Sequence, residues 1–243
     1  MKLKEAALLL AGLSLLFAGS AATQEQENGY LTVRTVVVKT GHGPEFTELL
    51  GKLGEKRSAA GHNGVNVWEM VRGPMATYYI VENHDTMADA GQPFESGMSE
   101  ADWQQWVGRI TSVVDHSTLT TLRTHPALAI PAEEDSPPNM MVLRYRTLKP
   151  GSNAAYHTWL EDKLVPALIE GGMKGWNISK VAMGEDPNTW ISARRIDSWE
   201  QLDEPPPLAY MNQRRRAALL QDADQMTVSN RMELIRHRPE LSY

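Results

Sequence analysis

An internal repeat divides this chain into two halves and constrains its fold more than any other feature. The sequence Leu-Arg-Thr-His-Pro-Ala-Leu at residues 122–128 returns as Ile-Arg-His-Arg-Pro-Glu-Leu at residues 235–241. Each copy places an aliphatic residue, an arginine, a proline and a leucine at the same spacing, and each closes a half of similar length. Self-similarity of this kind predicts that both halves fold into the same unit.

The repeat keeps its register along both halves. Lys39 and Lys149 open equivalent turns at an offset of 110 residues, Asp85 and Asp197 follow equivalent strands at an offset of 112, and the closing motifs lie 113 residues apart. Small loop insertions produce a drift of this size in a true duplication.

Each half predicts the element order strand, helix, strand, strand, helix, strand. β-branched and apolar runs predict the strands, and apolar residues at i, i+3, i+4 and i+7 predict the helices. In the first half the strands are expected at residues 30–39, 65–71, 77–81 and 118–124, with helices following residues 44 and 99. In the second half they are expected at residues 140–148, 176–183, 189–194 and 232–237, with helices around 156–164 and 211–223.

This order predicts an α+β fold made of two ferredoxin-like βαββαβ repeats. One such unit has four antiparallel strands with both helices on one face, and it leaves the other face uncovered. Two units in one chain can cover each other, so we expect an intramolecular, pseudo-dimeric α/β barrel with the helices outside. The repeats are expected at residues 30–129 and 139–243, joined by an acidic, proline-rich linker at 130–138.

The amino terminus predicts export. Lys2 and Lys4 precede an apolar run at residues 6–17, and residues 20–22 are small, which is typical of a signal peptide cleaved after Ala22. The apolar run is short for a membrane span, so we expect a periplasmic or secreted protein with no stable anchor after cleavage; an uncleaved anchor is the alternative. The chain has no cysteine, which excludes disulfides and thiolate catalysis.

Composition and motifs exclude several function classes. The 243 residues carry a net charge of −6, with no basic excess that would favour nucleic acid. The sequence has no nucleophile elbow, no phosphate-binding P-loop and no dinucleotide-binding glycine loop. No motif therefore specifies a reaction.

The doubled βαββαβ order resembles the dimeric α/β-barrel superfamily in a tandem fused form. The strand-loop-helix opening and the strands around Trp68 and Trp190 are similar to those of NIPSNAP-like and antibiotic-biosynthesis-monooxygenase-like domains. The resemblance covers residues 30–129 and 139–243. It implies a fold rather than one activity, because the superfamily includes cofactor-free monooxygenases, heme-binding and heme-degrading enzymes and lactone isomerases.

Alternation along the strands predicts one candidate ligand site. If aliphatic residues such as Val33, Leu143 and Ile235 pack beneath the helices, the opposite strand faces point into the barrel. Those faces carry charged and aromatic residues at equivalent repeat positions: Arg34, Tyr78, Glu82 and Arg123 in the first half, and Arg144, Trp190, Arg194 and Arg236 in the second. The excess of arginine predicts an anionic ligand such as a carboxylate. The alternative is that these arginines reach the barrel rims or pair with acids such as Glu69 and Glu233.

The seven histidines form no close ligand spacing, so no metal site is predicted. His84 and His157 each have two interpretations, a surface residue or a heme ligand or base. We expect no cofactor, while heme remains open.

The sequence therefore favours an exported protein that binds a small, anionic or aromatic molecule in or near the barrel. One alternative is a cofactor-independent monooxygenase or isomerase, and another is a structural or interaction module with a filled barrel. An oligomer is left open.

Overall fold

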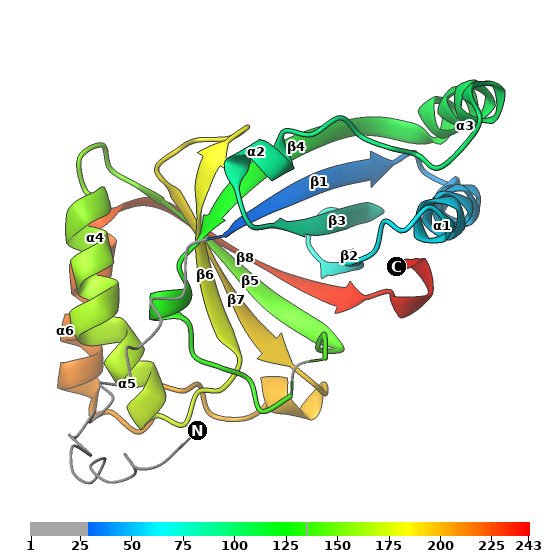
Figure 1. Cartoon of the computed structure of the whole chain (residues 1–243). Helices are drawn as coiled ribbons and strands as arrows, with labels where there is room; N and C mark the ends of the chain where they lie inside the picture. Colours follow the sequence, from blue (N-terminus) through cyan, green and yellow to red (C-terminus); the bar gives the residue numbers. More distant parts are fainter. Residues whose placement is uncertain (1–28, 135) are drawn as a thin grey trace, which may run out of the picture.

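The computed structural model describes residues 29–134 and 136–243 (Figure 1). In this part of the chain, eight antiparallel strands close into one barrel in the order β1-β3-β2-β8-β5-β7-β6-β4. The predicted fold, two βαββαβ repeats closed into one α/β barrel, is confirmed. The predicted signal peptide at residues 1–22 lies outside the described residues.

The first half follows the predicted order. Its elements are β1 (Tyr30–Val38), α1 (Gly43–Ala59), β2 (Val65–Arg72), β3 (Thr77–His84), the short α2 (Met87–Ala90), α3 (Glu100–Val113) and β4 (Val114–Thr124). Pro44 lies in the first turn of α1, where its missing N–H costs no helical hydrogen bond. The Ser99 side chain accepts a hydrogen bond from the Asp102 N–H and so caps α3.

The second half repeats this order with one irregular helix. After η1 (Pro126–Leu128), which closes the first half, its elements are β5 (Met140–Leu148), α4 (Asn153–Trp159), η2 (Leu160–Leu164), α5 (Val165–Glu170), β6 (Trp176–Met183), β7 (Thr189–Ile196), η3 (Glu200–Leu202), α6 (Gln213–Met226), β8 (Thr227–His237) and η4 (Pro239–Leu241). The segment η2 is a π-helical turn between α4 and α5. Pro166 has no N–H to donate to the carbonyl four residues earlier, which accounts for the wider turn just before it.

The two halves form hydrogen-bonded strand pairs with each other at both seams of the barrel. β4 of the first half pairs with β6, and β8 of the second half pairs with β2. Within each half the first strand lies between the third and fourth, as expected. Figure 1 shows α1 and α3 on one side of the barrel and α4, α5 and α6 on the opposite side.

Large side chains from both halves fill the barrel interior. A buried cluster combines Trp68, Met70 and Tyr79 of the first half with Leu143, Tyr145 and Ile235 of the second, and Val33, Val81, Met141, Ile191 and Ala193 pack against it. The Tyr79 hydroxyl donates to Glu233 Oε2 at 2.8 Å, and Arg231 Nε lies 3.2 Å from Glu233 Oε1. The interior is thus an apolar core around one paired carboxylate.

Two further clusters lie between the strands and the helices. In the first half, Val36, Val67 and Tyr78 of the sheet pack against Phe46, Leu49 and Leu53 of α1. In the second half, Leu148, Ile178 and Trp190 pack against Tyr156 and Trp159 of α4 and Leu219 of α6. Strands β1, β2, β3, β5 and β7 therefore bury residues on both faces, one in the barrel and one under helices.

Candidate functional site

The predicted inward orientation of the candidate site is wrong for all eight residues. Arg34, Tyr78, Glu82, Arg123, Arg144, Trp190, Arg194 and Arg236 lie on the outer faces of their strands. Their neighbours Val33, Tyr79, Leu143, Ile191 and Ile235 fill the barrel, and side chains alternate along a strand. The aliphatic set that we expected under the helices is the set that forms the barrel core.

In the first half, Tyr78 and Glu82 are held by local partners. Tyr78 packs on Phe46 with ring centroids 4.8 Å apart. Glu82 forms an ion pair with Arg57 of α1, and Arg57 Nη1 also donates to the Tyr243 hydroxyl at 2.9 Å. The buried charge of Arg57 is therefore compensated by Glu82, and Glu82 is not available to a ligand.

Arg236 confirms the alternative interpretation, because it pairs with an acid. Arg236 Nη2 lies 3.0 Å from Glu69 Oε2, and Arg238 Nη1 lies 2.7 Å from the same oxygen. Burial alone would raise the pKa of Glu69, but the hydrogen bonds from these two arginines lower it. Arg236 thus belongs to a surface ion pair at the β2–β8 seam.

Arg144 and Arg194 do come together, with Arg146 beside them. Within residues 29–134 and 136–243 none of the three forms an ion pair with a carboxylate. Burial lowers the pKa of Arg144, and the positive charges of Arg146 and Arg194 lower it further. Burial also lowers the pKa of Arg194. These three arginines, which we call the arginine cluster, concentrate positive charge on the outer face of β5 and β7.

Arg146 is the most deeply buried member of the arginine cluster, with 5% of its surface exposed. Its Nη1 donates to the Tyr156 hydroxyl at 3.3 Å, and its Nε has no hydrogen-bond partner. Its guanidinium carbon lies 5.7 Å from the ring centroids of both Tyr156 and Trp159. Aromatic rings attract a cation but do not neutralise its charge.

Trp190 connects the arginine cluster to a histidine. Trp190 is the β7 partner of Arg146, and its Nε1 donates to Asn153 Oδ1 at 3.0 Å. The His125 ring stacks on Trp190 at a centroid distance of 4.8 Å, and the His157 ring lies 5.8 Å from His125. Burial, together with the nearby His157, lowers the pKa of His125 to about 4. His125 is therefore neutral at pH 7, and its buried Nε2 has no hydrogen-bond partner.

The first half provides an internal comparison for this site. The repeat places Val36, Phe46, Leu49 and Tyr78 at the positions of Arg146, Tyr156, Trp159 and Trp190. The strand pairing agrees, because Val36 faces Tyr78 as Arg146 faces Trp190. The first half fills this layer with apolar packing, whereas the second half places an arginine among aromatic rings.

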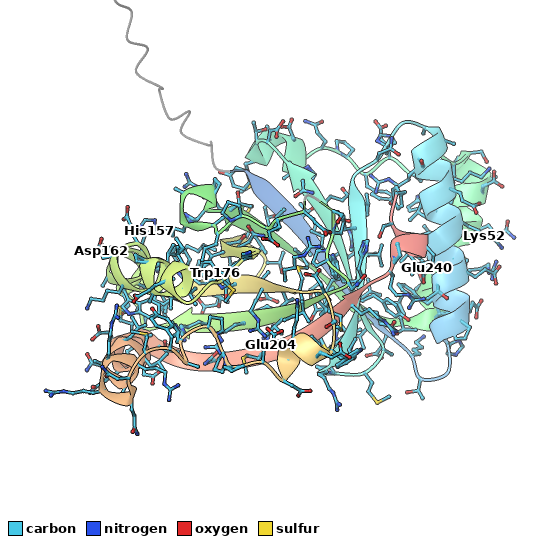
Figure 2. All side chains as sticks on the ribbon, turned by 90° about the horizontal axis from the view of Figure 1, so that it is seen from below. Lys52, His157, Asp162, Trp176, Glu204 and Glu240 are labelled. Carbon is cyan, nitrogen blue, oxygen red and sulfur yellow. The ribbon has the colours of Figure 1, made fainter. Side chains whose placement is uncertain are left out.

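A pocket of about 280 Å³ lies over this layer, between α4 and α6. It is lined by Ala155, Thr158, Trp159, Asp162, Lys163, Asp222, Gln225 and Met226. Trp159 lines the pocket and also contacts Arg146, so it separates the two. Lys163 Nζ reaches Asp222 Oδ2 at 2.7 Å and links the helices across the opening. Figure 2 shows Asp162 and His157 on this helix layer, with Trp176 on its sheet side.

A second pocket of about 290 Å³ lies at the other end of the same layer. Its lining includes Arg194 of the cluster together with Gly171, Lys174, Arg195 and Glu204. Both volumes lie near the lower end of the range for small-molecule sites.

Sequence reasoning missed Arg146, His125 and the pocket. Arg146 lies on the same strand face as Arg144, but its first-half counterpart, Val36, is neither charged nor aromatic, so the comparison of equivalent positions did not include it. The change from valine to arginine at one repeat position was the available signal. His125 stood inside the closing motif, but its stacking on Trp190 depends on the β4–β6 seam, which sequence spacing does not reveal.

No protein-family model matches the sequence, and no curated protein matches it. Solved structures do match the fold. A candidate monooxygenase from Lactobacillus acidophilus NCFM has 11% identity and a TM-score of 0.56 over 87% of this chain and 94% of that chain. An anthrone oxidase-like protein has 11% identity and a TM-score of 0.56 over 86% and 91%. Chlorite dismutase from Candidatus Nitrospira defluvii, solved with imidazole, has 11% identity and a TM-score of 0.53 over 87% and 92%. The chain therefore has the dimeric α/β-barrel fold in a tandem fused form, as predicted. The likeness to NIPSNAP-like domains stays a prediction.

Heme is neither confirmed nor excluded by the described residues. His125 Nε2 is buried and has no hydrogen-bond partner, as suits an axial ligand, and Trp190 stacks on the face of that ring rather than on the nitrogen. Neither pocket described above is lined by a histidine. The described residues also contain no group of three or more side chains that could hold a metal ion, and none of their helices is long and apolar enough to cross a membrane.

Proposed function

We propose that the second half binds a small anionic molecule in the layer between its sheet and helices α4 and α6. The supporting observation is Arg146, a buried guanidinium with no carboxylate partner in the described residues and with Arg144 and Arg194 nearby. Burying a charge without an opposite charge costs several kcal/mol, so such a group is explained by a partner that arrives from solution.

A shortage of acids does not explain the missing partner. The chain has 30 acidic residues against 24 lysines and arginines. The equivalent layer of the first half also buries an arginine, Arg57, and pairs it with Glu82. The second half leaves its buried arginine unpaired and adds two more, which favours a ligand as the counter-charge.

The surrounding groups support a flat carboxylate as the ligand. A guanidinium binds a carboxylate through two parallel hydrogen bonds. Tyr156 and Trp159 stack on each other with centroids 5.3 Å apart and offer aromatic surface beside Arg146. The pocket above Trp159 provides an entry route if the Trp159 ring turns aside.

The experiment is a titration that follows tryptophan fluorescence. Benzoate is expected to bind, and benzamide, which has the same ring without the charge, is expected to bind at least tenfold more weakly. The Arg144→Met variant should lose at least about tenfold in benzoate affinity, since hydrogen bonds to charged groups contribute about 1.5–3 kcal/mol. Arg34→Met is the matched control, because Arg34 occupies the equivalent position in the first half, and its affinity should be unchanged. Equal binding of benzoate and benzamide, or equal losses in both variants, would exclude this function for aromatic carboxylates.

One observation favours an enzyme as the second candidate. His125 is a neutral imidazole with a free, buried Nε2 beside Trp190, which is the state that a proton acceptor requires. Several proteins of the same fold are described as monooxygenases, and we propose a reaction of that kind only as an alternative to binding. An oxygen-electrode assay with a phenolic carboxylate distinguishes them, because a binder consumes no oxygen.

A further inference from the structure

Met232 lies directly beside the arginine cluster. It is the β8 partner of Arg144 in the strand register, and Arg144 Nη2 donates to Met232 Sδ at 3.1 Å. The Met232 side chain is also open to solvent, with 59% of its surface exposed. A thioether sulfur is only a weak acceptor, so this contact leaves the charge of Arg144 largely available.

We propose that Met232 is an oxidation site whose sulfoxide holds Arg144 and thereby weakens anion binding in the second half. The oxidant is a hydroperoxide such as hydrogen peroxide. Its O–O bond breaks, one oxygen forms a bond to Sδ, the sulfur is oxidised by two electrons, and the peroxide is reduced to water. Methionine sulfoxide forms in this way and is reversed by methionine sulfoxide reductases.

The contact distinguishes Met232 from the other exposed methionines. Met75 is 88% exposed and Met183 is 57% exposed. Met232, in contrast, accepts a hydrogen bond from an arginine, Arg144. Oxidation at Met75 changes a free surface group, whereas oxidation at Met232 changes a group already in contact with a guanidinium.

The consequence follows from acceptor strength. A sulfoxide oxygen is a much stronger acceptor than a thioether sulfur, so it forms a charge-assisted hydrogen bond with Arg144 Nη2. That donor is then no longer free for a carboxylate. The loss of one such bond predicts a dissociation constant about tenfold higher after oxidation. Only this affinity effect rests on the proposed function; the sulfoxide–Arg144 contact does not.

The experiment compares wild type, Met232→Leu, Arg144→Gln and the double variant, each before and after hydrogen peroxide treatment. Peptide mass spectrometry measures oxidation at Met232, with Met75 as the internal standard for exposure. Thermal denaturation gives the shift in midpoint caused by oxidation in each protein. The shift attributable to Met232 is expected to depend on Arg144, because the new hydrogen bond is lost in Arg144→Gln. Benzoate titration of the same samples is expected to show the tenfold loss in wild type and no loss in Met232→Leu.

Two results would overturn the inference. One is that Met232 stays reduced while Met75 is fully oxidised. The other is that the midpoint shift caused by Met232 oxidation is the same with and without Arg144. If the midpoints are coupled but benzoate binds to none of the proteins, the modification site stands and the proposed function fails for this ligand class. If benzoate binds and oxidation leaves its affinity unchanged, the regulatory part is wrong and the binding site stands.

Discussion

Replacing Arg146 by methionine is predicted to stabilise the ligand-free protein. Methionine has a similar length and packs against Tyr156 and Trp159 without a charge. The substitution removes the hydrogen bond to the Tyr156 hydroxyl, worth about 1 kcal/mol, and two aromatic contacts of the guanidinium. It also removes the desolvation cost of a charge with no carboxylate partner, which is several kcal/mol. We expect a net gain of about 1–3 kcal/mol, which corresponds to a rise in melting temperature of about 2–12 °C for a chain of this size.

Arg57→Met is the matched control and should have the opposite effect. Arg57 and Arg146 are exposed to 7% and 5%, so the two arginines are buried equally. Arg57 differs in its ion pair with Glu82, and its removal leaves that carboxylate without its partner. Breaking such a pair costs about 3–5 kcal/mol.

Calorimetry of both variants without ligand measures the two changes. The prediction is that the melting temperature rises in Arg146→Met and falls in Arg57→Met. If Arg146→Met lowers the melting temperature as much as Arg57→Met does, then Arg146 is a satisfied structural residue and the case for a ligand as its counter-charge collapses.

Three further predictions concern groups around the barrel. Tyr79→Phe removes the hydrogen bond to Glu233 inside the barrel and should cost about 1–3 kcal/mol in urea denaturation; an unchanged midpoint would show that the carboxylate is satisfied without it. The folded pKa of His125 is about 4 and its ordinary value is 6.5, so the unfolded chain binds more protons between these values and stability falls as pH drops from 6.5 to 4. His125→Gln should flatten this interval, and a His125 ring signal that titrates near 6.5 by NMR would contradict the assignment. Because Arg236 and Arg238 lower the pKa of Glu69, that pair contributes stability above the ordinary carboxylate pKa and loses it in acid; Glu69→Gln should remove this part of the acid transition, and an identical acid profile would refute it.

The fold was predictable because duplication and element order act together. Five equivalent elements in register require two copies of one unit, and a βαββαβ unit with an open face requires a partner. The element bounds needed small corrections only. β4 and β8 begin several residues earlier than expected, at Val114 and Thr227, because their polar, exposed first residues pair with β1 and β5.

Alternation of side chains did not predict which face of each strand points into the barrel. Alternation separates one face of a strand from the other, but it identifies the inner face only where the other face meets water. Here Val33 and Val36 both lie in apolar clusters, one in the barrel and one under α1. Charged residues were assigned to the barrel because the aliphatic faces of the strands were placed under the helices. The structure fills it with Trp68, Tyr79 and Tyr145 instead.

Three of the predicted site residues lie together, but outside the barrel. Arg144, Trp190 and Arg194 do lie in one layer, but that layer is on the helix side of the second sheet. Arg34 and Glu82 lie on the outer face of the first half, whereas Arg123 pairs across the seam with Lys180, the β6 partner of Trp190. Equivalence between repeats located the strands correctly. The same equivalence gave a wrong site assignment. A site that is present in only one copy lies at positions where the two copies differ, as at Val36 and Arg146.

The most direct test is a crystal structure with 4-bromobenzoate, in which anomalous scattering locates the bromine atom. We expect a single strong bromine peak in the layer between the second sheet and α4 and α6, with the carboxylate on Arg146 or Arg144. A bromine peak inside the barrel or beneath α1 would contradict the central claim. So would a compound that binds in solution and leaves Arg146 without an anion.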